Sequence, residues 1–368
     1  MRLGTILGIP IRVDVSWSLV FLLMTLALAR GLFPQWVPGQ TAAAYLLMGA
    51  AASIALFACI VLHELAHAVV GRRYGMKFDD IVLFMFGGVA RLRTEPISPR
   101  AEIMMAVAGP LMSAALALGF WSGAAMLPNA SPALTGILGY LAFLNTALVL
   151  FNLVPGFPLD GGRIFRAGVW HFTGDFRKAT RWATLTGRAI GLVLIALGLF
   201  DLLTGRGSGL WTMLVGWFLF AAARASDHQS RLEATLKDVP VRTVMNPDPP
   251  VVEPHSTVAE AVRSMALARS PRVPVLDLGR LVGQVEAERV RGISPHEWES
   301  TWVRDVMTPI ERTQTVEEGD TALRAFRRTL DEQNGELYVV SGGRLAGTVT
   351  RDSLWDLARL RLEQRRAS

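Results

Sequence analysis

Six long apolar stretches in the first 225 residues constrain this chain more than any other feature. They fall near residues 15–32, 42–70, 101–127, 133–153, 186–204 and 209–224. A helix of about 20 apolar residues is long enough to cross the hydrocarbon core of a bilayer. Because the backbone finds no water there, each spanning segment must satisfy its own polar groups, as a helix does. The sequence therefore predicts a polytopic α-helical membrane region of about six transmembrane helices.

Positive charge in the connecting segments indicates how these helices are oriented. The N-terminal segment and the loops on its side carry thirteen basic residues, whereas the opposite loops carry Arg30 and Arg206. The thirteen are Arg2, Arg12, Arg72, Arg73, Lys77, Arg91, Arg93, Arg100, Arg163, Arg166, Arg177, Lys178 and Arg181. Cytoplasmic loops collect Lys and Arg. We therefore expect a multi-pass protein of a prokaryotic cell membrane, in contact with lipid, with both termini in the cytoplasm.

The remainder of the chain, residues 226–368, has the mixed composition of a soluble domain. Over the whole chain 18% of residues are charged, against roughly 25% in soluble domains, and the deficit lies in the apolar stretches. The net charge is +6. We nevertheless expect no nucleic-acid partner, because the sequence has no basic stripe with interleaved aromatic residues.

An H-E-x-x-H motif, formed by His63, Glu64 and His67, lies inside the second apolar stretch. Residues i and i+4 of a helix share a face, so both imidazoles can bind one zinc ion. The glutamate between them can accept a proton from water at such a metal. Ionisable side chains are costly within a membrane and indicate function. The alternative is a polar cluster that only holds helices together.

A catalytic zinc ion has three protein ligands, so a third ligand is needed. Residues 152–162 read N-L-V-P-G-F-P-L-D-G-G, and Asp160 is the candidate within them. Pro155 and Pro158 prevent a regular helix, and broken backbone at membrane depth is tolerated where it is buried in protein or lines a water-filled cavity. The span before this segment ends on the side where His67 lies. The alternative for Asp160 is an ordinary helix cap in an interfacial loop.

These motifs together resemble the site-2 protease family of intramembrane zinc metalloproteases. Residues 8–17, G-I-P-I-R-V-D-V-S-W, also resemble the start of that family, and the resemblance covers about residues 1–225. It implies hydrolysis of peptide bonds within or next to transmembrane segments of membrane-protein substrates, in regulated intramembrane proteolysis. It further implies one zinc ion bound by the two histidines and Asp160, with Glu64 activating water and Asn152 holding the substrate or the tetrahedral oxyanion. Relatives often have His where Asp14 stands here, which leaves the role of Asp14 open.

Residues 76–95 are β-prone around Gly87 and Gly88 and predict a small hairpin on the cytoplasmic side. In a protease of this kind, an exposed strand edge can capture an extended substrate segment by β-addition. A purely structural hairpin is the equally weighted alternative.

An internal repeat begins after a short linker, residues 226–238. Residues 241–247, V-R-T-V-M-N-P, recur at 303–309 as V-R-D-V-M-T-P, and residues 280–285, R-L-V-G-Q-V, recur at 344–349 as R-L-A-G-T-V. A repeat that mixes apolar β-like runs with helical stretches predicts two similar α/β modules, residues 239–292 and 302–360.

The two modules resemble a pair of CBS domains, which often bind adenine nucleotides between their halves. In the family pattern an acidic residue follows a Ser or Thr by three positions. Here Ser353 follows Thr350 at that spacing, and Asp352 is displaced by one; the first repeat has Glu286 and Arg289 instead. Thr350 and Asp352 are therefore the candidate nucleotide ligands. A structural role and a homodimer through the pair remain open beside nucleotide binding.

A different functional class fits some of the same features. CBS pairs also occur on ion transporters and channels, in which intramembrane His, Glu and Asp residues form an ion path. A pore needs neither H-E-x-x-H nor a proline-broken L-D-G-G segment, so the sequence favours a protease modulated by its cytoplasmic CBS pair. An inactive homologue that binds membrane proteins is a third alternative, against which the intact Glu64 argues.

Overall fold

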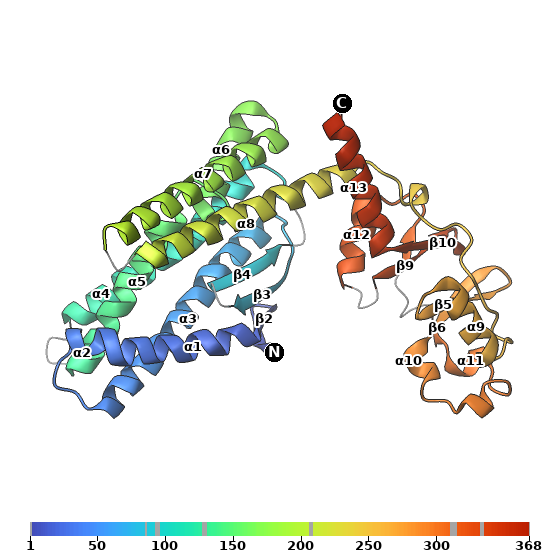
Figure 1. Cartoon of the computed structure of the whole chain (residues 1–368), viewed down its shortest axis with the longest axis horizontal. Coiled ribbons are helices and arrows are strands. Elements are labelled where there is room, and N and C mark those ends of the chain that lie inside the picture. Colours follow the sequence, from blue (N-terminus) through green and yellow to red (C-terminus); the bar gives the residue numbers. More distant parts are fainter. Residues whose placement is uncertain are drawn as a thin grey trace. The chain divides into compact units, whose positions relative to one another are not determined.

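The computed structural model describes residues 2–84, 87–92, 96–126, 131–205, 209–309, 315–331 and 335–367. The chain forms two compact units, Met1–Asp227 and His228–Ser368. Figure 1 follows the elements of each unit along the chain.

Within the described residues, six helices are long and apolar enough to cross a membrane, which confirms the predicted fold class. They are Val15–Trp36, Ala42–Arg73 (α3), Pro99–Met126 (α4), Pro132–Asn152 (α5), Phe176–Leu203 (α7) and Gly209–Ser226, the first part of α8 (Gly209–Leu236). The first span joins α1 (Val15–Ala27), a π-helical turn (Leu28–Leu32) and α2 (Phe33–Trp36). Only 17% to 39% of each apolar window is buried within the protein. Most of the apolar surface is thus left for lipid.

Short polar residues begin four of these spans by capping free backbone N–H groups. Thr41, Ser131 and Asp175 do so for α3, α5 and α7. Asp14, whose role was open, accepts a 3.0 Å hydrogen bond from the backbone N–H of Ser16 at the start of α1. Hydrogen bonds from Ser16 lower the pKa of the Asp14 carboxyl. Asp14 therefore acts as a helix cap.

Close helix packing in the membrane unit depends on residues without side chains. A Cβ on Gly191 of α7 would lie 2.8 Å from the carbonyl oxygen of Gly216 in α8. A Cβ on Gly198 of α7 would likewise lie 2.6 Å from the carbonyl oxygen of Gly209. Small residues let helix backbones approach closely where lipid provides no hydrophobic drive for association. The glycines thus hold α8 against α7.

A four-stranded sheet is formed in the described part of the membrane unit. Its order is β1 (Arg2–Ile6), β2 (Ile9–Val13), β3 (Phe78–Phe84) and β4 (Gly87–Leu92). The predicted hairpin is present as the antiparallel pair β3 and β4, while residues 85–86 and 93–95 of its predicted range lie outside the described residues. Two features were not predicted from the sequence. The glycine pair begins β4 instead of lying at the turn. The N-terminal hairpin of β1 and β2 joins the same sheet, because β2 pairs with β3 in parallel. The sheet packs on α3 through Ile9, Leu65, Ala68 and Ile81.

A buried aspartate ties three of these strands together. Asp80 of β3 is 1% exposed. Both of its carboxylate oxygens accept hydrogen bonds from the Arg91 guanidinium of β4, and Arg12 Nε of β2 lies 3.0 Å from Oδ2. The bonds to Arg91 lower the pKa of Asp80. The stabilisation is therefore full above the ordinary pKa of an aspartate and is lost as the pH falls through the lowered value.

The second unit contains the two predicted α/β modules, each with its own core. Its described residues form one sheet with the order β5 (Arg272–Asp277), β6 (Arg280–Glu286), β10 (Arg344–Thr350), β9 (Glu336–Ser341) and β8 (Thr315–Glu317), with β7 (Thr308–Pro309) pairing to β6. The helices are α9 (Val258–Ala268), α10 (Ala287–Val290), α11 (Val303–Val306), α12 (Ala322–Asp331) and α13 (Arg351–Ala367). Helix α8 occupies most of the expected linker, as far as Leu236, which packs in the second module's core with Val239 and Val241.

Candidate metal centre

The two histidines of the H-E-x-x-H motif are buried on one face of α3. His63 is 3% exposed and His67 is 7% exposed. Their rings lie edge to face, with centroids 4.9 Å apart. The helical spacing of four residues places them one above the other, as the sequence analysis expected.

The broken segment after α5 brings Asp160 to the same place. Asp160 is the first residue of α6 (Asp160–Thr173). A Cβ on Gly161 would lie 2.4 Å from the carbonyl oxygen of Leu153, and one on Gly162 would lie 2.3 Å from the carbonyl carbon of Gly156. The glycine pair therefore lets α6 start directly against the end of α5, and this close approach sets the position of Asp160.

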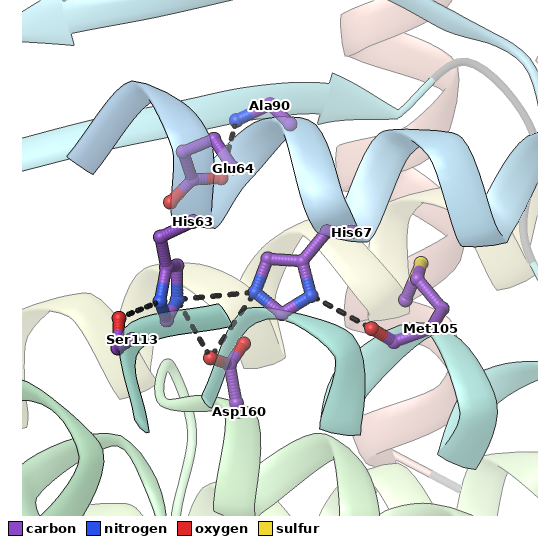
Figure 2. Close-up of polar contacts among 7 residues, drawn as sticks. All are labelled: His63, Glu64, His67, Ala90, Met105, Ser113 and Asp160. Carbon is purple, nitrogen blue, oxygen red and sulfur yellow. Dashed lines mark hydrogen bonds and ion pairs between the residues drawn. The ribbon is translucent and has the colours of Figure 1, made fainter. Parts of the chain in front are cut away.

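Three ligand atoms converge from these two helices, as Figure 2 shows. His63 Nε2, His67 Nε2 and Asp160 Oδ2 are each 3.2 Å from the other two. Bonds of 2.0–2.2 Å from zinc to nitrogen and oxygen, in tetrahedral geometry, separate neighbouring ligand atoms by about 3.3 Å. The spacing therefore fits a zinc ion with three protein ligands and one open position.

Helix α4 was not predicted to take part in the site, but two of its residues contact the imidazoles at their Nδ1 atoms. His67 Nδ1 lies 2.7 Å from the carbonyl oxygen of Met105, and His63 Nδ1 lies 2.8 Å from Ser113 Oγ. A carbonyl oxygen can only accept, so His67 Nδ1 carries the proton, which we assign from this bond. In the neutral ring Nε2 then presents a lone pair to the metal position. Such outer partners orient metal-binding histidines.

A glycine on α4 faces the two imidazoles. A Cβ on Gly109 would lie 2.2 Å from His67 Nε2 and 2.6 Å from His63 Nε2. No side chain of any size fits there beside the ligand atoms. The signal available in the sequence was a Gly-Pro pair, Gly109 and Pro110, in an otherwise apolar span.

A buried ion pair joins α4 to α6. Glu102 of α4 is 0% exposed, and its Oε1 accepts hydrogen bonds from Nε and NH2 of Arg166 in α6, the first at 2.7 Å. Glu102 lies one turn from Met105, and Arg166 lies two turns from Asp160. The pair therefore connects the helix that orients the histidines to the helix that carries the third ligand.

The motif glutamate is turned toward β4 (Figure 2). Glu64 Oε2 accepts a 3.1 Å hydrogen bond from the backbone N–H of Ala90. A Cβ on Gly88 would lie 2.9 Å from Glu64 Cγ, so the glycine allows the strand to approach the helix at this point. The sheet thus fixes one carboxylate oxygen of Glu64.

A cavity of about 260 Å³ contains all five residues that the sequence analysis singled out in the membrane unit, namely His63, Glu64, His67, Asn152 and Asp160. Its other walls include β4, Leu148 and Phe151 of α5, Arg163 of α6 and Phe218 of α8. Asn152 is the last residue of α5. No described residue forms a hydrogen bond with its side-chain amide, which lines the cavity beside the ligand set.

The candidate nucleotide residues line a second cavity, of about 500 Å³, within the CBS unit. Thr350 ends β10 and Asp352 lies in the first turn of α13, and residues of the first module, including Ser270 and Arg272, line the cavity as well. Thr350 and Ser353 also cap α13 through reciprocal 3.2 Å bonds between backbone and side chain. A carboxyl group lies in the wall as well: Ser270 Oγ donates to Glu336 at 2.6 Å, and burial raises the pKa of Glu336.

Glu286 occupies, in the first module, the position that Thr350 occupies in the second. It accepts a 2.8 Å hydrogen bond from Gln284 Nε2, and its Oε1 lies 3.7 Å from Arg272 Nε. The departure of the first repeat from the nucleotide pattern thus coincides with an internal ion pair.

Comparisons with known proteins identify relatives of both units of the chain. The family model of peptidase family M50 matches residues 51–132 and 127–194, and that of the CBS domain matches residues 241–293 and 303–354. Rip3 of Mycobacterium tuberculosis is 36% identical over 365 residues, which cover 97% of this chain and 92% of Rip3. Zinc metalloprotease MJ0392 of Methanocaldococcus jannaschii is 30% identical over 359 residues, covering 96% and 94%. A solved structure, the site-2 protease from Methanocaldococcus jannaschii, has 30% sequence identity and a TM-score of 0.44, and covers 62% of this chain and 94% of that one.

The alternative of an ion transporter is not favoured, because relatives over nearly the full length are zinc metalloproteases by name. These alignments, at 30% identity or more overall, span 96% to 97% of the chain. The chain therefore belongs to peptidase family M50, the site-2 proteases, as a membrane-embedded zinc metalloendopeptidase that carries a pair of CBS domains.

Proposed function

We propose that His63, His67 and Asp160 bind one zinc ion per chain and that Glu64 and Asn152 act with it in peptide hydrolysis. The observation that carries this proposal is the ligand triangle formed by His63 Nε2, His67 Nε2 and Asp160 Oδ2, with 3.2 Å between each pair of atoms. Both Nδ1 atoms are engaged elsewhere, by Met105 and Ser113, so each imidazole has Nε2 left for the metal.

The residues around the triangle have the chemistry that hydrolysis requires. A zinc ion held by such a set acidifies water and polarises the peptide carbonyl. Glu64 accepts the proton of the attacking water and returns it to the leaving amine. The Asn152 amide donates a hydrogen bond to the carbonyl oxygen of the substrate as negative charge develops on it. Helix α4 keeps the imidazoles in one orientation throughout.

The substrate in this proposal is an extended segment of a membrane protein, and β4 is where it binds. β4 ends the sheet order and lines the cavity. The Ala90 N–H points to Glu64, away from the β3 ladder. An exposed strand edge can pair with an incoming strand and offer its peptide bonds to the site. A hairpin that serves only to hold Glu64 is the alternative.

Zinc analysis tests the proposal directly. We expect the purified chain in detergent to contain about one zinc ion, measured by elemental analysis, because three ligands and an open position are typical of catalytic zinc. His67→Ala should retain far less than one. His171→Ala is the matched control, since this exposed histidine at the end of α6 is outside the cavity. A folded wild-type chain that binds no zinc would rule out the proposed metal set.

We propose further that both termini lie in the cytoplasm. The thirteen basic residues in the loops on the N-terminal side support this orientation. A reporter fused after Ser368 should then read as cytoplasmic, and one inserted between the fifth and sixth spans should read as external. The opposite pattern of reporter signals would reverse the orientation.

We also propose that the CBS unit binds an adenine nucleotide in its 500 Å³ cavity and thereby modulates cleavage. Fluorescent ATP, ADP and AMP should each be titrated on the full chain. We expect Thr350→Ala with Asp352→Ala to weaken binding about tenfold or more, because hydrogen bonds to charged groups contribute roughly 1.5–3 kcal/mol. Asp356→Ala, exposed on the same helix, should bind as the wild type does.

The regulatory part of this proposal has its own measurement. Deleting residues 236–368 should leave zinc content unchanged but alter the cleavage rate or its response to nucleotide, since a ligand shifts a conformation only when it prefers one state. If the truncated chain cleaves with the same kinetics as the full chain, with and without nucleotide, the CBS unit does not regulate cleavage. A wild-type chain that binds no nucleotide and is dimeric in detergent, but monomeric after the deletion, would instead favour the dimerising role.

A further inference from the structure

Two arginines on α6, one turn apart, have opposite surroundings. Arg166 donates to the buried Glu102, and its guanidinium lies between the rings of Phe157 and Phe176, at 4.7 and 4.6 Å from their centroids. Arg163 lies one turn closer to Asp160 and lines the catalytic cavity. No described residue forms an ion pair or a hydrogen bond with its side chain.

The acidic groups that line the same cavity are already engaged. Glu64 accepts the hydrogen bond from Ala90, and Asp160 Oδ2 faces both histidines. Helices α5 and α8 contribute the apolar Leu148, Phe151 and Phe218 and the neutral Asn152. Among the described residues, therefore, none serves as a counter-ion for Arg163, whose cavity is otherwise lined there by uncharged side chains.

An arginine keeps its charge at any physiological pH and presents its donors in a planar fork. Partial removal of such a group from water is unfavourable unless an anion pairs with it. A carboxylate is the partner that matches the fork, through two parallel charge-assisted hydrogen bonds. A neutral peptide carbonyl would accept one bond and leave the charge uncompensated.

We propose that Arg163 binds an acidic side chain of the substrate, so that this site-2 protease selects segments with an Asp or Glu close to the scissile bond. The inference rests on the proposed function of the cavity. Residues three apart on a helix have Cβ atoms about 5–6 Å from each other, and an extended peptide advances roughly 3.3 Å per residue. The acidic residue therefore lies within about three residues of the bond that is cut.

The test uses a fluorogenic transmembrane peptide in detergent micelles, with a single Glu placed in turn at each of the three positions on either side of the cleaved bond. Gln and Lys versions of every peptide provide the comparison. At one position the wild-type enzyme should show a KM at least about tenfold lower for Glu than for Gln, as expected of a charge-assisted pair. Arg163→Gln should abolish this difference, and Arg163→Glu should prefer Lys there. Arg177→Gln, an exposed arginine outside the cavity, should behave as the wild type does.

Binding is measured separately in the Glu64→Gln background, where the same peptides are titrated without turnover. The preference for Glu should appear in the dissociation constant and disappear when Arg163→Gln is added. A loss of kcat that is equal for Glu and Gln peptides, with KM unchanged, would assign Arg163 to the oxyanion and overturn the proposal. Equal binding of the Glu, Gln and Lys peptides at all six positions would also overturn it. A wild-type enzyme that cleaves none of the peptides counts against the proposed function, and the titrations still decide the role of Arg163.

Discussion

Glu64→Gln should lose peptide cleavage by roughly 10²–10⁴-fold, the usual contribution of a general acid or base, and should keep its zinc. The glutamine has nearly the same shape, and its side-chain oxygen can still accept the hydrogen bond from Ala90 that holds Glu64 now. It cannot accept a proton from the attacking water. The site should therefore stay assembled while the chemical step fails.

This prediction is checked by cleavage of a transmembrane peptide in micelles, with zinc measured on the same samples. Glu288→Gln is the matched control, because this exposed glutamate lies in the CBS unit. The result that would contradict the assignment is cleavage at the wild-type rate, since Glu64 would then not be the base. Loss of zinc in Glu64→Gln would show instead that the carboxylate holds the metal site together.

Gly109→Ala should remove zinc binding, and peptide cleavage should fall with it by about 100-fold, the upper end of what disturbing the partners of metal-binding side chains costs. The added Cβ would lie 2.2 Å from His67 Nε2 and 2.6 Å from His63 Nε2, closer than real contacts allow. The imidazoles have little room to retreat, because their Nδ1 atoms are hydrogen-bonded to Ser113 and to Met105 on the same helix. Either α4 moves away and both bonds are lost, or the ligand triangle opens.

Alanine stabilises a helix relative to glycine by about 1 kcal/mol. A loss of zinc in Gly109→Ala would therefore result from the steric clash and not from a weaker helix. Gly119→Ala on the same helix meets nothing within 4 Å and should leave zinc and activity unchanged. Zinc content and thermal unfolding are measured for both variants. Full zinc content in Gly109→Ala would show that a side chain is tolerated at this position and that the close approach of α4 does not set the ligand positions.

The features that the sequence predicted correctly depend on short stretches of chain. A span is recognised from about 20 neighbouring residues, because bilayer thickness is a single length that any crossing helix must match. The shared face of His63 and His67 follows from helical spacing alone. The two α/β modules follow from the repeat, since similar stretches of sequence pack in similar ways.

The surroundings of the metal centre depend on how helices rotate against one another, which local pattern does not encode. Ser113 and Met105 contact histidines that lie 50 and 38 residues earlier in the chain. The N-terminal strand β2 pairs with β3 across 70 residues, from Ile11 to Ile81. Pairings at such separations result from the packing of whole elements, so no short window of sequence contains them.

Arg163 and Arg166 of α6 show most directly what the sequence alone does not determine. Both lay among the basic residues that indicated orientation, and nothing local distinguishes Arg163 from Arg166. Their roles differ because Glu102, 64 residues away, is brought within hydrogen-bond distance of Arg166 by the packing of α4 on α6. One helical turn away, Arg163 meets the cavity instead. The role of a charged side chain depends on the groups that the folded chain places beside it. Coulomb attraction and hydrogen bonding depend on distance in space, over a few ångströms, and not on separation along the sequence.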